Sequence, residues 1–195
     1  MTPFTIGIIC FTLAATWRIR WKRVTIEPFR RSRALTLAAC GVPLGLALAG
    51  RSDCSLAIAL SAVAVCGITD LATGLIFDVV TFPALSATLL AACMGGHLLH
   101  SAIGASICGG GLLALHLGTR GRGLGLGDVK LASVIGAGLG GVSSIEAIGC
   151  AFVLGALVAI PAMVMRRIRQ GESVAFGPYL AAGTAVVASM KALGA

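Results

Sequence analysis

Two aspartates, Asp70 and Asp128, are the residues of this sequence best suited to catalysis. Each stands at the end of an apolar run, where a carboxylate is costly to keep, and they lie 58 positions apart. Two carboxylates brought close at low dielectric cannot both ionise comfortably, so they share a proton and act together as acid and base. Such a pair activates a water for attack on a peptide carbonyl. This is the chemistry of an aspartic protease, and it needs no metal or cofactor.

A glycine-rich stretch, residues 123–127, comes directly before Asp128. Gly125 and Gly127 permit close backbone approach and unusual dihedral angles, which predicts N–H and C=O groups exposed to an extended substrate. A nucleotide-binding loop is a poor interpretation of this stretch. It has no G-x-x-x-x-G-K-[ST] motif, and the one G-x-G-x-x-G spacing in the chain lies inside an apolar run without a preceding strand. A flexible connector is the plainer alternative.

The acids and the neighbouring lysine also have plainer explanations than catalysis. Asp70 or Asp128 alone would be a helix-end or N-cap residue at the membrane interface. Asp78, just before an apolar run, fits an N-cap better than a catalytic role, and Lys130 is expected to snorkel to the headgroups. Glu146 is expected to be a capping or dipole partner.

The composition is that of an integral membrane protein. Hydrophobic residues make up 57% of the chain and charged residues 11%, with a mean hydropathy of +1.00. Apolar runs separated by short polar gaps predict an all-α fold, a polytopic bundle of transmembrane helices. No soluble domain fits between the runs, so residues 1–195 are predicted to form a single membrane domain, with its motifs within about residues 55–192.

The formal net charge of +8 is concentrated in three loops. Basic residues crowd residues 18–33, 120–130 and 166–169, and only Arg51 and Lys191 lie elsewhere. This is the positive-inside pattern of cytoplasmic loops and not the face of a nucleic-acid-binding protein. Anionic lipid headgroups of the bilayer are the expected partners, and nucleic acid is not.

Eight spans place every basic cluster on one side of the membrane, with the N-terminus outside and both aspartates at the cytoplasmic face. The sixth is short and would reduce the count to seven if it were a half-span. Its Gly136 and Gly140 allow close helix approach, and Pro161 is expected to break the seventh span. The predicted spans are residues 3–17, 34–50, 55–69, 79–99, 101–117, 128–141, 143–165 and 174–192.

The seven cysteines do not suggest a metal site or a disulfide framework. No C-x-x-C pair occurs, and all but Cys54 lie inside apolar runs, so the others are expected to be small core residues. His97, His100 and His116 have no Cys or carboxylate at ligand spacing, which argues against zinc.

Three motifs resemble, in the same order, those of the type IV prepilin peptidases, membrane aspartic proteases with a G-x-G-D motif. G-L-G-D-V-K-L at residues 125–131 is similar to the family's G-x-G-D-x-K-L run. I-T-D-L at 68–71, with I-F-D at 76–78 and T-F-P at 81–83, resembles the segment of the first aspartate. A-F-G-P-Y-L-A at 175–181 resembles the P-F-G-P-F-L-A run near the family's C-terminus.

The resemblance implies that Asp70 and Asp128 are the catalytic pair. It implies cleavage of the basic leader of prepilin or pseudopilin precursors at the cytoplasmic face of a bacterial inner membrane, by a multi-pass protein. Gly177 and Pro178 would form a helix break that supports the site, or simply begin the last span. Asp78 and Lys130 fall within the matching motifs and are further candidates for supporting the site.

The chain departs from the family pattern in two places. Phe77 stands where the family commonly has proline. The long forms of the family carry a cytoplasmic insert with paired C-x-x-C motifs and also methylate the new N-terminus, whereas this chain has only residues 18–33 in the corresponding loop. It therefore resembles the short peptidase forms, and methyl transfer has no support in the sequence.

Two other classes of function fit the composition. One is a small proton-coupled transporter in which Asp70 and Asp128 relay protons, although both acids lie at one face and no inverted repeat is evident. The other is a non-catalytic subunit of a pilus or secretion assembly, with the glycine loop as a docking site. Helix faces rich in Gly and Ala pack equally well within and between chains, so they do not fix an oligomeric state.

Overall fold

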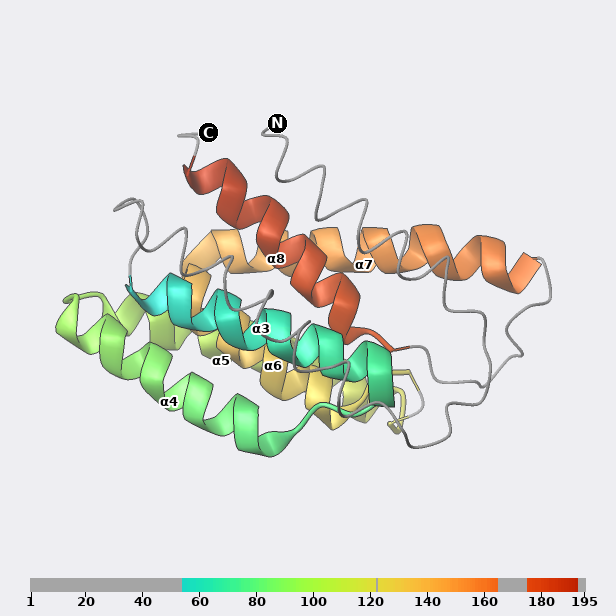
Figure 1. Cartoon of the computed structure of the whole chain (residues 1–195), viewed down its shortest axis with the longest axis horizontal. Coiled ribbons are helices and arrows are strands. Elements are labelled where there is room, and N and C mark those ends of the chain that lie inside the picture. Colours follow the sequence, from blue (N-terminus) through green and yellow to red (C-terminus); the bar gives the residue numbers. More distant parts are fainter. Residues whose placement is uncertain (1–53, 122, 165–174, 193–195) are drawn as a thin grey trace.

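The computed structural model describes residues 54–121, 123–164 and 175–192, and within these ranges the chain forms helices and no strand (Figure 1). The predicted all-α fold is thus confirmed for this part of the chain. The first two predicted spans and the basic loops at 18–33 and 166–169 lie outside it. The helices are α3 (Cys54–Thr73), α4 (Asp78–Met94), α5 (Leu98–Gly118), α6 (Leu126–Leu139), α7 (Gly141–Val164) and α8 (Gly177–Ala192).

Helix α6 is the centre of the bundle, because it contacts each of the other five helices in the described ranges. Its apolar side chains are correspondingly buried, with Leu131 and Ile135 wholly inaccessible. Further pairs pack around it: α3 contacts both α4 and α8, and α7 contacts α8. Figure 1 shows α3 between α4 and α8. The helix that follows the glycine-rich stretch is therefore the one that every other described helix helps to position.

Close contact between α5 and α6 depends on a pair of glycines. A Cβ on Gly104 would collide with the carbonyl oxygen of Gly136, and a Cβ on Gly136 would collide with the backbone of Gly104. The two helix backbones therefore touch directly at this point, where no side chain fits between them. The predicted close approach at Gly136 is confirmed.

Within the described ranges, three helices are long and apolar enough to cross a membrane, by length and composition. These segments are Cys54–Leu71, Leu98–Gly118 and Gly141–Pro161, and Asp78–Met94 is a shorter apolar helix. Helix α6 has 14 residues, which at 1.5 Å per residue makes it about 21 Å long, against a hydrocarbon core about 30 Å thick. Its shortness agrees with the short sixth span expected from the sequence.

Two predictions about individual spans were wrong, the end of the fourth span and the break in the seventh. Helix α4 ends at Met94, whereas the apolar run predicted a span to residue 99, because Gly95 and Gly96 follow and Gly96 adopts a positive φ of 74° that ends the helix. Pro161 was expected to break the seventh span, but α7 continues through it. Pro161 lies in the last turn of α7, so only three residues of helix follow the backbone hydrogen bond that it removes.

The cysteines of the described ranges only partly follow the expectation of small core residues, and Cys10 and Cys40 lie outside these ranges. Cys66 and Cys108 are buried and Cys150 is half-buried, whereas Cys93 is exposed near the end of α4, so the prediction was wrong for Cys93. Cys54 is exposed, as its position outside the apolar runs suggested.

Candidate active site

Asp70 lies near the C-terminal end of α3 and is held by the first residue of α8. Its side chain is 5% exposed, and its Oδ2 accepts a 2.8 Å hydrogen bond from the backbone N–H of Gly177, 107 positions away. That N–H is one of the free donors at the start of a helix, where the helix dipole favours a carboxylate. The last described helix thus positions the first aspartate.

Gly177 can donate this bond because it has no side chain. A Cβ at this position would lie 2.8 Å from Asp70 Oδ2 and 3.0 Å from Asp70 Cβ, closer than atoms pack without displacement. Pro178 follows in the first turn of α8, where a residue without an N–H costs no helical hydrogen bond. The sequence left two interpretations of Gly177 and Pro178, a helix break that supports the site or the start of the last span; α8 begins at Gly177, and the structure adds the direct contact with Asp70.

Asp128 is the third residue of α6 and is also buried, at 8% exposure. Gly125 precedes the helix in an extended conformation, and its backbone N–H donates to Asp128 Oδ2 at 3.2 Å. The aspartate therefore caps its own helix, which was the plainer explanation considered for it. Burial and the approach of a second carboxylate go beyond what a capping residue requires.

The two carboxylates lie close enough for their charges to interact. The packing of α3 against α6 brings them together although they are 58 positions apart. Both are buried, and each is oriented by a backbone N–H from a glycine. Because the charge of Asp70 acts on Asp128, it is unfavourable for both buried acids to be ionised at once, which is the property that acid–base chemistry by two aspartates needs.

Gly127 allows the loop between α3 and α4 to pack against the start of α6. A Cβ on Gly127 would lie 2.9 Å from Cβ of Ile76, so any larger residue would displace that loop. The contact joins the segment that follows Asp70 to the segment that carries Asp128. Gly125 and Gly127 thus help to position the two aspartates relative to each other.

Asp78 and Lys130 form a salt bridge across the same junction. Lys130 Nζ lies 2.7 Å from Asp78 Oδ1 and 2.8 Å from Oδ2, and 5.0 Å from the centre of the Phe82 ring. Asp78 is the first residue of α4, with Phe77 at the N-cap, so the expectation of an N-cap role for Asp78 was wrong. Lys130 binds a carboxylate of a neighbouring helix, which snorkelling alone did not predict. The bridge ties the start of α4 to α6.

Phe77 occupies the position of the family's proline without a distorted backbone. Its φ of −83° and ψ of 125° are extended, and this φ is close to the value that proline imposes. Its carbonyl oxygen accepts hydrogen bonds from the N–H groups of Val80 and Thr81 at the start of α4. The substitution therefore leaves a loop of ordinary geometry.

His116 is a positioning residue that sequence reasoning missed. It lies near the end of α5, and its Nδ1 makes a 2.6 Å hydrogen bond with the carbonyl oxygen of Leu124, just before Gly125. The positive φ of 73° at Gly121 lets the intervening chain turn beside the ring. A histidine at the polar end of an apolar helix, shortly before the glycine stretch, was the available signal.

Comparison with known proteins decides the family. A family model described as the type IV leader peptidase family matches residues 57–160, which is more than half of the chain and includes both aspartates. The chain belongs to this family. The resemblance found in the motifs is therefore confirmed, and it includes the segments around Asp70 and Asp128.

Two curated relatives match over a longer range. Both bear the name prepilin leader peptidase/N-methyltransferase and come from Burkholderia pseudomallei, strains 1026b and K96243. Each is 36% identical over 149 residues, which is 73% of this chain and 46% of the relative. The chain thus spans about half the length of these relatives. No solved structure matches it significantly.

Proposed function

We propose that the protein is a membrane-embedded aspartic endopeptidase that removes the basic leader from prepilin-like precursors. One observation carries the proposal: two buried aspartates from distant parts of the sequence interact at the junction of α3, α6 and α8, each oriented by a glycine N–H. Membership of the type IV leader peptidase family supplies the substrate class. Asp70 and Asp128 are the proposed catalytic residues.

In the proposed mechanism the pair holds one proton and a water between its carboxylates. The ionised aspartate takes a proton from the water, the water attacks the peptide carbonyl, and the protonated partner donates to the carbonyl oxygen. The aspartate that took the proton from water then gives it to the leaving amine as the C–N bond breaks, while its partner takes a proton from a hydroxyl of the diol, so that the pair returns to its starting state. Gly177 and Gly125 keep one oxygen of each acid fixed, which directs the carboxylates toward a common water.

The remaining site residues have supporting roles in this proposal. The backbone at Gly125 and Gly127 lies beside the substrate, where an extended peptide can pair with main-chain groups. Asp78 and Lys130 hold α4 against α6, and Gly177 with Pro178 starts α8 beside Asp70. None of these six residues is assigned a proton transfer.

The proposed setting is the bacterial inner membrane, with eight spans, the N-terminus outside and the pair at the cytoplasmic face. The three basic loops support this orientation, because positive charge collects on the cytoplasmic side. A precursor with a basic leader followed by a hydrophobic helix would present its cleavage point at that depth. The pair lies at the ends of α3 and α6, as this placement requires.

The test is leader removal from a prepilin co-expressed with the wild-type chain, with Asp70→Asn or with Asp128→Asn. Each variant is expected to insert normally and leave the precursor uncut. Glu146→Gln is the matched control, because Glu146 is an exposed carboxylate on α7. Full processing by either aspartate variant would disprove the pair. Normal processing together with a lost proton or solute flux would indicate a transporter instead.

A further inference from the structure

A cleft lies at the ends of α3, α6 and α8 that are remote from the aspartates. It has a volume of about 240 Å³ and includes Leu56 from α3, Leu139 and Gly140 from the end of α6, His100 from α5 and Lys191 from α8. Fourteen positions of α3 separate Leu56 from Asp70, about 21 Å at 1.5 Å per residue. This cleft is therefore separate from the candidate active site.

Lys191 is unusual for its position. It is one of two basic residues outside the three basic loops, and α8 carries it to the end opposite Gly177. Its Nζ donates to the carbonyl oxygen of Leu139 at 3.1 Å, which satisfies part of the C-terminal end of α6. An ammonium group has three donors, so two remain for a ligand.

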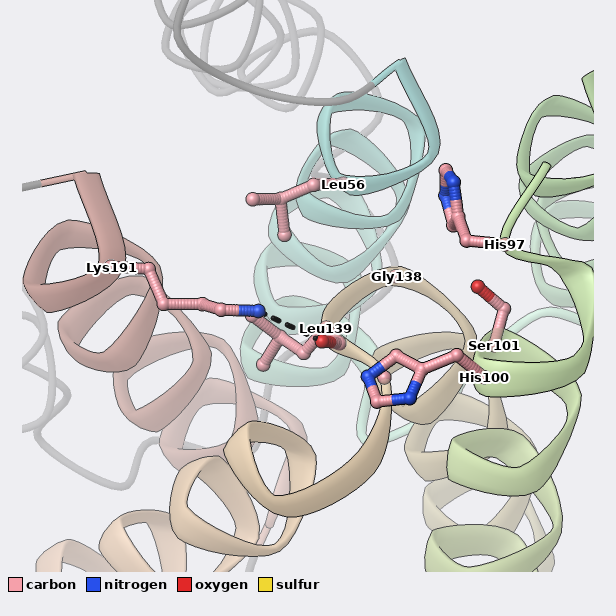
Figure 2. A pocket seen from close by; sticks show the side chains of 8 residues that line it. Leu56, His97, His100, Ser101, Gly138, Leu139 and Lys191 are labelled. Atoms are coloured by element: carbon pink, nitrogen blue, oxygen red, sulfur yellow. Dashed lines mark hydrogen bonds between the residues drawn. The ribbon is translucent and has the colours of Figure 1, made fainter. Parts of the chain in front are cut away.

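His100 faces the same space from the other side. Its ring packs against Gly140 and Gly141, where a Cβ on either glycine would collide with it. Figure 2 shows the Lys191 side chain reaching toward Leu139 from α8 and the His100 ring on the opposite side of that residue. His97, by contrast, is engaged by the hydroxyl of Ser55 at 3.2 Å and by the carbonyl of Gly95 at 3.1 Å. The ring nitrogens of His100 make no hydrogen bond with the described part of the chain and are available to a ligand.

The charge and size of the cleft select a small anion. Among the described residues that line it there is a lysine, two histidines and a serine, and no carboxylate. Its volume is below the roughly 300–1,000 Å³ of sites for drug-sized ligands. Lysine binds phosphate as a point charge, and an imidazole N–H adds a directed donor.

We propose that Lys191 and His100 form a binding site for a phosphate group, carried either by a phospholipid headgroup or by free inorganic phosphate. In the proposed topology this site lies near the ends of α3, α5 and α8, where apolar helices meet the headgroups. The glycines at 140 and 141 shape the site by leaving room for the His100 ring. This proposal does not depend on the proposed peptidase activity.

The test uses the purified full-length chain in a phosphate-free maltoside detergent. Inorganic phosphate is titrated at constant ionic strength against chloride while the melting temperature is followed. In a second arm, native mass spectrometry measures binding of phosphatidylglycerol, with diacylglycerol as the lipid without phosphate. The variants are Lys191→Gln and His100→Gln. Lys191→Arg is the control that keeps the charge.

A saturable effect of inorganic phosphate would identify the free anion as a ligand, and binding of phosphatidylglycerol alone would identify the headgroup. In either arm both Gln variants are expected to bind about tenfold more weakly or worse, whereas Lys191→Arg binds as the wild type does. Melting temperatures measured without ligand show whether each variant is folded. If Lys191→Gln does not fold, Lys191→Arg still tests the role of the charge. Binding of neither phosphate nor phosphatidylglycerol, or binding unchanged by both Gln variants, would overturn the proposal.

Discussion

Gly177→Ala is the substitution that most specifically perturbs the orientation of Asp70. The new Cβ would lie 2.8 Å from Asp70 Oδ2, whereas ordinary contact begins near 3.4 Å. If the start of α8 retreats by the difference, about 0.6 Å, the 2.8 Å hydrogen bond from Gly177 N–H lengthens to about 3.4 Å. That is outside the roughly 2.7–3.2 Å range of such bonds.

The expected loss of activity follows from the weakening of the hydrogen bond between Gly177 N–H and Asp70. A hydrogen bond to a charged group contributes about 1.5–3 kcal/mol, and lengthening it forfeits much of that amount. If this lost free energy is needed to orient the reacting carboxylate in the transition state, leader cleavage slows by about 10- to 150-fold, at about 1.4 kcal/mol per factor of ten. The initial rate of cleavage of a prepilin by the purified chain measures this, with thermal unfolding recorded on the same sample.

Gly149→Ala is the matched control. Gly149 lies within α7, and a Cβ there would meet no atom within 4 Å. This variant is expected to cleave at the wild-type rate and to be stabilised by about 0.5–1 kcal/mol, because alanine is the better helix former. A folded Gly177→Ala variant that cleaves as fast as the control would refute the role assigned to the Gly177 N–H.

Three further substitutions probe the residues around the pair. Lys130→Met should lower the free energy of unfolding by less than about 1 kcal/mol, because the pair with Asp78 is partly exposed, yet slow cleavage by loosening α4 from α6. His116→Ala should raise KM about fivefold, because the loss of a hydrogen bond of about 1 kcal/mol to Leu124 frees the loop before Asp128. Phe77→Pro should leave cleavage unchanged and stabilise the fold by about 0.4–1 kcal/mol, since the backbone already has a compatible φ.

Each of these three predictions has its own control or contradicting result. Exchanging the charges, with Asp78→Lys and Lys130→Asp together, should recover part of the lost cleavage, and no recovery would argue against the bridge. His116→Asn retains a donor near Leu124 and is expected to bind substrate better than the alanine variant does. A Phe77→Pro chain that loses activity while remaining folded would show that the Phe77 ring itself contributes.

The sequence was sufficient to predict the helical fold and to mark the candidate acids. Long apolar runs admit few alternatives to spanning helices, and a carboxylate at the end of such a run is conspicuous. The motifs around Asp70, Asp128 and Gly177 also indicated the family. These are local patterns, which a single sequence displays directly.

The partners of those residues could not be predicted, because they depend on packing between distant segments. The hydrogen bond from Gly177 to Asp70 joins residues 107 positions apart, and the bridge from Lys130 to Asp78 joins residues 52 apart. Snorkelling and N-capping were sensible local expectations for Lys130 and Asp78, but the packing of α4 against α6 brings them together. The contact between His116 and Leu124 depends on the path of a turn, which glycines leave undetermined.

The most direct test of the central claim is the cleavage rate of a prepilin by Asp70→Asn, Asp128→Asn and the double variant, measured on the purified chain. If the two carboxylates act as one unit, removing the second after the first costs nothing more. The expected result is that the double variant and both single variants share the same residual rate. A double variant slower than either single variant by the product of their separate losses would contradict a shared catalytic pair.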